Sequence, residues 1–176
     1  MCDLKLIEPT KEHEAQAMEF RQEFINLGEA RINGSWGLQR YENYHEWMEI
    51  IASLKLLQPS DDGVPSTTYF CMRKSDGKIV GAIQLRHTLN DQLRKLGGHV
   101  GYSVRPTERG KDYATKMLTL VLTEARQLNL SQIMLTCHKS NPASSKVIIK
   151  NGGVLTGEAT DERDGEVVET YLINLK

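Results

Sequence analysis

Residues 103–125, SVRPTERGKDYATKMLTLVLTEA, place a strand end, a basic turn and a helix start side by side. The β-like run 100–104 stops before Pro106, and a polar turn follows over residues 107–111. Apolar residues then recur at the i, i+3, i+4, i+7 spacing of a helix with one buried face. They are Ala114, Met117, Leu118, Val121, Leu122, Ala125 and Leu128. The stretch therefore predicts a strand, a turn and a helix N-terminus.

The turn before this helix has the chemistry of an anion site. A helix start presents backbone N–H groups without intrahelical partners, together with a partial positive charge. Arg109 and Lys111 flank Gly110 and add two cations, so the turn could cradle a phosphate. The same residues also fit an ordinary strand-to-helix loop whose charges face water, and both interpretations stay open here.

Outward from this stretch, apolar segments alternate with turn signals along the whole chain. The predicted strands are residues 4–7, 67–73, 78–87, 98–104, 132–137, 154–158 and 167–174. The predicted helices are residues 10–28, 44–54, 113–128 and 142–151, with a glycine-containing loop at 28–41 and a polar excursion at 90–96. The order is β-α-α-β-β-β-α-β-α-β-β. Periodicity alone supports an α/β or α+β fold with one domain.

Composition narrows the classes of protein. The 176 residues suit one domain, and the net charge of −1 without a polybasic block argues against nucleic acid or anionic lipid as a partner. Cys2, Cys71 and Cys137 are scattered without metal-ligand spacing, which predicts reduced thiols in a cytoplasmic protein and no metal. The N-terminus has no long apolar run, so neither a signal peptide nor a membrane span is expected.

Residues 109–114, RGKDYA, resemble the acetyl-coenzyme A motif R/Q-x-x-G-x-G/A of the GNAT acetyltransferase superfamily. The V-x-P segment at residues 104–106 and the run NPASSKVIIKNGG at residues 141–153 also match that family. The resemblance implies one GNAT-like domain over residues 1–176, with a mixed central sheet of about seven strands flanked by about four helices. It departs at Asp112, where the family keeps a glycine that lets the backbone approach the pyrophosphate.

In that family the turn wraps the coenzyme A pyrophosphate, and two strands splay apart around pantetheine. Here the strands would be residues 98–105 and 132–137, with a backbone N–H near residues 103–105 meeting the thioester carbonyl. For the run that begins at Asn141, helix capping and a solvated lysine explain the residues equally well. The coenzyme-binding residues that the resemblance implies are Val104, Arg105, Arg109, Gly110, Lys111, Asp112, Tyr113, Ala114, Asn141, Ser144 and Lys146.

The catalytic groups are less closely matched. Many members carry a glutamate base on the fourth strand where this chain has His99, whose side chain could instead simply reach solvent. The family's tyrosine acid falls at Ile148, so water or another hydroxyl, from Tyr102 or Tyr171, would protonate the thiolate. His87, at a strand end, and His138, in the loop after residues 132–137, are further candidate bases, although each also fits an ordinary loop histidine.

The acceptor site of this family lies over the N-terminal helices and the hairpin. Aromatic residues there would suit a cationic or apolar acceptor. Helix packing explains Trp47 at least as well. The residues that fall in this region are Trp36, Arg86 and His87, together with Arg31, Tyr41 and Trp47.

The leading interpretation is an acyl-coenzyme A dependent N-acyltransferase. It would move acetyl from acetyl-CoA to a primary amine of a small molecule or peptide, by direct attack in a ternary complex. The alternative is a catalytically silent module of the same fold that binds coenzyme A or another ligand, which Asp112 and Ile148 favour. A homodimer is compatible with either, and neither involves nucleic acid or membrane.

Overall fold

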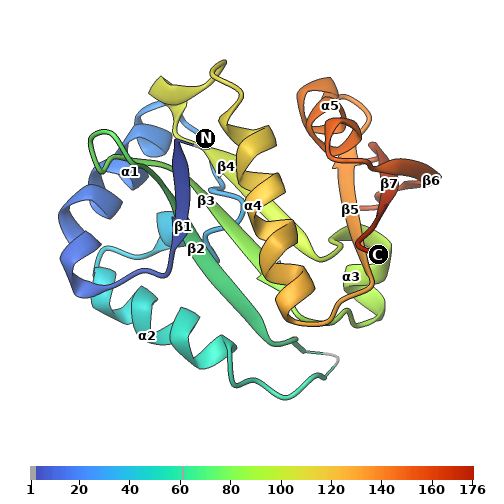
Figure 1. The fold of residues 1–176 in the computed structure, drawn as a ribbon, viewed down its shortest axis with the longest axis horizontal. Coiled ribbons are helices and arrows are strands. Elements are labelled where there is room, and N and C mark those ends of the chain that lie inside the picture. The colour runs from blue at the N-terminus through green and yellow to red at the C-terminus, as the bar shows by residue number, and fades with distance from the viewer. Residues whose placement is uncertain (1–2, 61) are drawn as a thin grey trace.

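The computed structural model describes residues 3–60 and 62–176, so Cys2 lies outside the described part (Figure 1). Its strands are β1 Leu4–Ile7, β2 Ser66–Arg73, β3 Ile79–Arg86, β4 Val100–Val104, β5 Gln132–His138, β6 Val154–Thr160 and β7 Val167–Asn174. Its α-helices are α1 Glu14–Asn26, α2 Tyr44–Leu54, α3 Asp91–Leu96, α4 Tyr113–Gln127 and α5 Pro142–Lys150. The predicted fold class and order are confirmed, with one helix more than predicted.

The additional helix is α3, which occupies the segment predicted to be a polar excursion. Its six residues carry no buried apolar face, so no periodic signal marks them. The local cause is Asn90, whose side chain accepts a hydrogen bond of 3.0 Å from the Leu93 backbone N–H. Asparagine is among the best residues for capping a helix start in this way.

The strands form two antiparallel sheets instead of one continuous sheet, in the orders β1-β2-β3-β4 and β5-β7-β6. The sheets meet where the His99 backbone N–H donates to the Met134 carbonyl at 2.7 Å. Beyond that point β4 pairs with β3 and β5 pairs with β7. The expectation that residues 98–105 and 132–137 splay apart agrees with this division.

Helices cover both faces of the first sheet (Figure 1). Phe70 of β2 packs with the aromatic residues of α1 and α2 on one face. Its neighbour Cys71 belongs to the core on the other face, beneath α4, as the alternation of side chains along a strand requires. The same core includes Ile133 and Ile173 of the second sheet, so α4 joins the two sheets.

The apolar face predicted for α4 is buried at Met117, Leu118 and Val121. Leu128, predicted to lie on that face, is instead 42% exposed because the helix ends at Gln127. Among the described helices, none is long and apolar enough to cross a membrane.

Candidate functional site

A groove of about 1110 Å³ lies where β4 and β5 diverge. Its narrow end is held by Gly98, which has a φ of +62° and whose missing Cβ would lie 2.5 Å from the Met134 carbonyl oxygen. A side chain there would push the two sheets apart. Along β4, Tyr102 and Val104 line the groove, and Leu135 and Cys137 line it from β5.

The turn before α4 forms part of one wall of this groove. Gly110 has a φ of +78° and Asp112 a φ of +59°, both in the left-handed region. Aspartate tolerates that region better than most residues, though less readily than glycine. The position therefore needs a positive φ, which is a second physical reason for the family's glycine besides close approach to the pyrophosphate.

The Asp112 carboxylate faces α4 and α5. It accepts hydrogen bonds from the Thr115 hydroxyl at 2.7 Å and from Lys150 Nζ at 3.0 Å. The Thr115 bond and then the Lys150 ammonium lower the pKa of Asp112, so this carboxylate is ionised at neutral pH. Ala114 and Tyr113 follow it along the groove wall.

Arg109 also lines the groove, and it is paired with a carboxylate that the sequence did not indicate. Its guanidinium makes a two-pronged contact with Glu29, at 2.7 and 2.9 Å, and lies 5.6 Å from the centre of the Phe24 ring. The Glu29 hydrogen bonds raise the pKa of Arg109. Eighty positions separate the two partners, so no local spacing signals the pair.

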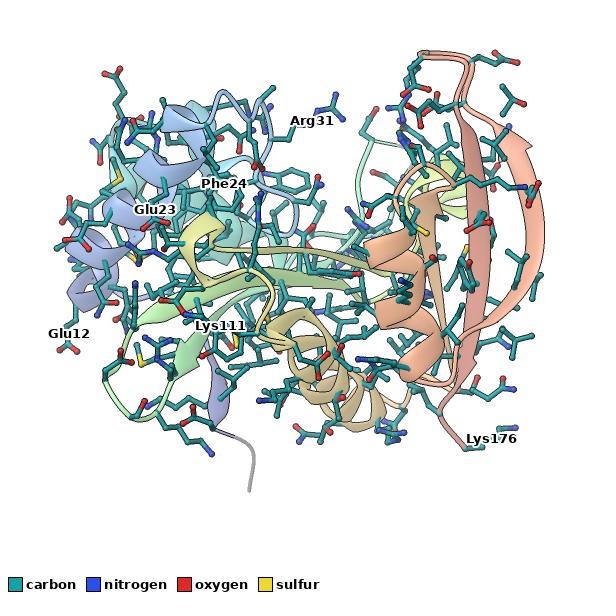
Figure 2. All side chains as sticks on the ribbon, turned by 90° about the horizontal axis from the view of Figure 1, so that it is seen from above. Glu12, Glu23, Phe24, Arg31, Lys111 and Lys176 are labelled. Carbon is teal, nitrogen blue, oxygen red and sulfur yellow. The ribbon has the colours of Figure 1, made fainter. Side chains whose placement is uncertain are left out.

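Lys111, labelled in Figure 2, does not line the groove, and its ammonium donates to Glu108, which does. Glu108 is only 4% exposed and accepts hydrogen bonds from Arg73, Lys78 and Lys111 at 2.7–2.8 Å. Burial alone would raise the pKa of Glu108, but the bonds from Lys111, Lys78 and Arg73 lower it to about 2. This buried carboxylate anchors the turn from beneath, a role that the sequence analysis missed.

Midway along the groove, Tyr102 and Ser144 share a hydrogen bond of 2.8 Å between their hydroxyl oxygens. Burial raises the pKa of Tyr102, which keeps its proton at neutral pH. Asn141 caps α5 by accepting from the Ser144 backbone N–H at 3.1 Å. Ile148, at the position of the family's tyrosine, is fully buried in the core.

The histidines differ in their relation to the groove. His99 Nδ1 accepts the Met134 backbone N–H at 3.0 Å, and burial lowers its pKa to about 4. His87 is hydrogen-bonded to the Thr67 hydroxyl at 2.9 Å. Neither lines the groove, whereas His138 does, with Nδ1 3.4 Å from the Glu166 carboxylate.

Of the remaining candidate residues, some line a hollow and others lie outside the groove. Arg105 is 5% exposed and bonded to Glu23 at 2.6 Å, outside the groove lining, and Lys146 is likewise outside it. Trp36 and Arg86 line a second hollow beside the groove. Trp47 is buried in the helix core, as the packing interpretation expected.

The chain matches the family model of the acetyltransferase (GNAT) domain over residues 4–154. A search of curated proteins finds no match.

Solved structures resemble the chain along its length. A ribosomal L7/L12 alpha-N-protein acetyltransferase in complex with coenzyme A has a TM-score of 0.70 and 17% identity, covering 99% of this chain and 95% of the other. A chimaera of spermidine N-acetyltransferase SpeG from Vibrio cholerae and hSSAT has a TM-score of 0.68 and 17% identity, covering 99% and 96%. The Salmonella typhimurium protein yncA, with its cofactor acetyl-CoA, has a TM-score of 0.65 and 15% identity, covering 99% and 95%. At these identities the likeness concerns the fold alone.

Proposed function

Because the chain belongs to the GNAT acetyltransferase family, we propose that it transfers acetyl from acetyl-CoA to a primary amine. The observation that carries the proposal is the groove of about 1110 Å³ between diverging strands, with the N-terminus of α4 in its wall. Two of the similar structures contain coenzyme A or acetyl-CoA. The groove, the helix start and the family together support the assignment.

The residues present fit a pyrophosphate at the turn. The first turn of α4 offers backbone N–H groups and the positive end of its dipole. A Cβ placed on Gly110 would meet nothing within 4 Å, so the space in front of the turn is open. Arg109 stands at this wall and would exchange Glu29 for a phosphate oxygen. Asn141 and Ser144, at the start of α5, would meet the pantetheine arm.

Bound acetyl-CoA supplies a thioester, which an amine cleaves as the C–N bond forms and the C–S bond breaks. The chain must remove one proton from the amine and return one to the sulfur. We assign the first role to His138, since it lines the groove and its Nδ1 lies 3.4 Å from the Glu166 carboxylate, which would orient the ring. We assign the second to Tyr102, whose protonated hydroxyl lines the groove.

The second candidate is a silent coenzyme-binding module. Asp112 and the buried Ile148 favour it, because both depart from the family's pattern. A thiolate with a pKa near 8.5 is a fair leaving group even without an acid, so the missing tyrosine does not by itself abolish transfer.

Two measurements separate these functions. Acetyl-CoA should raise the melting temperature, because a ligand that binds the native state stabilises it. Amine-dependent thiol release should follow, and it should fall by roughly 10²-fold or more in His138→Ala. Coenzyme binding without thiol release from any amine supports the silent module. No thermal shift at millimolar coenzyme overturns both.

A further inference from the structure

A second hollow, of about 490 Å³, adjoins the groove. It lies between the loop of residues 30–40 and β3, and it shares Arg31, Asn33, Gly34 and Arg86 with the groove. Its volume is within the range of small-molecule sites. We call it the arginine pocket, because Arg31, Arg40 and Arg86 line it.

No carboxylate lines the arginine pocket within the described residues. Across residues 3–60 and 62–176, none of its arginines has an Asp or Glu oxygen within 4.0 Å. The acids that line the adjoining groove are already paired with cations, Glu108 with Arg73, Asp112 with Lys150 and Asp161 with Arg163. The pocket therefore has an uncompensated positive charge.

Arg86 is the least exposed of the three arginines, whereas Arg31 and Arg40 are exposed. One of the terminal nitrogens of Arg86, Nη1, donates to the Gly97 and Gly98 carbonyls at 3.2 and 2.9 Å. Burial lowers its pKa, the direction expected of a cation that lacks a neighbouring anion. A guanidinium presents five donors in a fixed fork that matches a carboxylate or phosphate. The two carbonyls accept hydrogen bonds from the Arg86 guanidinium, but they carry no net charge. The cation therefore has no counterion among the described residues.

The loop that supplies the other arginines is fixed in place. Gly34, with a φ of +79°, lies so close to β4 that a Cβ would be 2.4 Å from the Gly101 carbonyl oxygen. Ser103 Oγ donates to the Asn33 carbonyl at 2.8 Å, and Trp47 Nε1 donates to the Ser35 carbonyl at 2.7 Å. Gly37 leaves room for the Arg40 guanidinium, which a Cβ would meet at 2.4 Å.

Arg31 extends from this loop toward the C-terminal half of the molecule (Figure 2). Arg31 comes from the loop and Arg86 from β3, and both residues line the groove as well as the arginine pocket. An oxyanion bound between Arg31 and Arg86 would lie beside the groove. The acceptor amine must enter that groove to react. A positive field of this kind repels a polycation such as spermidine.

We propose that the acceptor is a small amine that also carries an oxyanion, a carboxylate or a phosphate, held in the arginine pocket. This inference rests on the proposed acetyl transfer and narrows its substrate class. The amine end points into the groove, and the anionic end binds Arg86 together with Arg31 or Arg40.

The test compares acceptors with and without an anionic group at the end opposite the amine. Thiol release is measured at saturating acetyl-CoA with 4-aminobutanoate, its amide and 1,4-diaminobutane, and in parallel with 2-aminoethyl phosphate and ethanolamine. We expect kcat/KM to be about tenfold or more higher for the anion than for the neutral partner, since hydrogen bonds to charged groups contribute that much. The two anions distinguish a carboxylate site from a phosphate site.

Variants of the loop keep the test independent of folding. Arg40→Gln and Arg31→Gln should each lower the anion preference, and Arg40→Glu should favour 1,4-diaminobutane. Arg94→Gln, on α3 and outside both hollows, makes the same charge change and serves as the control. Arg86→Gln is informative only if its melting temperature is unchanged, because Arg86 also holds Gly97 and Gly98.

A binding measurement covers the case in which none of these amines is acetylated. Calorimetric titration of 4-aminobutanoate and 2-aminoethyl phosphate into the coenzyme A complex should show binding that Arg40→Gln weakens. Acetylation that favours the amide or the diamine, or anions that bind no better than their neutral partners, overturns the inference and leaves acetyl transfer intact. Failure of acetyl-CoA itself to bind overturns the proposed function instead.

Discussion

The turn before α4 and the arginine pocket are both basic, but their cations differ in whether they have carboxylate partners. At the turn before α4, Arg109 pairs with Glu29 and Lys111 with Glu108, and Lys150 of α5 pairs with Asp112. In the arginine pocket, none of the arginines has a carboxylate partner within the described residues. The cations of the turn must give up their carboxylate partners to bind an anionic ligand. The arginines of the pocket have no such partner to give up.

This difference affects how each region should bind. Exchange of one anion for another returns little net energy, so the turn gains its selectivity from backbone geometry and from several contacts at once. In the arginine pocket the cost of a charge without a counterion falls on Arg86, which is largely out of water, whereas Arg31 and Arg40 are exposed and stay hydrated.

The largest effect should come from Glu108→Gln, which makes the turn resemble the arginine pocket. Removing one partner of a buried charge cluster costs about 3–5 kcal/mol, because the remaining cations lose their compensation. For a chain of this length that corresponds to a melting temperature lower by roughly 6–20 °C. Denaturant unfolding measures the free energy directly, and a change below 1 kcal/mol would contradict the anchoring role.

The Glu108 carboxylate also makes the free energy of unfolding depend on pH. The folded pKa of Glu108, about 2, lies below the unfolded value of about 4.3. Its contribution is thus complete above the unfolded value and is lost as pH falls from there toward the folded value. The free energy of unfolding should decline less steeply over that acid range in Glu108→Gln than in the parent protein.

Next in size is the exchange at Arg109. Arg109→Gln should weaken coenzyme A binding by about 1.5 kcal/mol, the low end for a hydrogen bond to a charged group, because Arg109 gives up Glu29 when it binds a phosphate. Glu29→Gln, its matched partner, should tighten binding several-fold, because Arg109 no longer has to leave a carboxylate. Isothermal titration calorimetry measures both. If both variants bind more weakly, Glu29 supports the site and does not compete with the ligand.

Asp112→Gly should have a smaller effect. The aspartate repels a nearby phosphate by about 1 kcal/mol per charge in water at 4 Å, and its removal also frees Lys150. We expect coenzyme A to bind about tenfold more tightly, or ~1.4 kcal/mol, with a smaller gain at high salt. Asp112→Asn, which removes the charge and keeps a side chain at the positive φ, separates charge from backbone geometry.

Trp36→Gly should change stability by about 1 kcal/mol or less. Trp36 has a φ of +52°, which is strained for a bulky residue. Glycine would relieve about 1–2 kcal/mol of strain at this position. Part of that gain is offset because glycine makes the unfolded chain more flexible. The indole lines the arginine pocket, so the KM for the acceptor should rise as stability rises. Trp36→Phe should leave both nearly unchanged.

The smallest expected effect is at His99, which belongs to neither region. Because burial lowers its pKa to about 4, His99 is uncharged at neutral pH and does not titrate near 6.5. The pH profile of kcat/KM above pH 5 should therefore be the same in His99→Asn as in the parent. A shifted acidic limb would restore His99 as the base.

How far the sequence predicts the molecule depends on the range of the interaction. The strand, turn and helix of residues 100–127 are predicted because their signals, a proline, a glycine and an apolar period, are local. The groove wall at Arg109 and Asp112 follows from a motif within six residues. Glu108, three residues before Lys111, was within reach of the same reasoning as an i, i+3 pair.

The rest depends on contacts between distant segments. Glu29 meets Arg109 only after α1 has packed on the first sheet. His99 looked like a base from its strand position, but its imidazole is occupied by a backbone N–H of another sheet. The charge of the arginine pocket is invisible in a chain of net charge −1, because it arises from which side chains share a surface.

The divergence of the two sheets also has a consequence for aggregation of the protein during storage. Both β4 and β5 are edge strands, and they face each other across the groove. The outer edge, β6, is exposed along its length, with Val154 65% and Leu155 47% accessible. Open strand edges are templates on which other chains add strands and aggregate. The described strands therefore present four such edges, β1, β4, β5 and β6, when the groove is empty. When ligand fills the groove, chiefly β1 and β6 remain open, so ligand should slow aggregation of a stored sample as well as permit turnover.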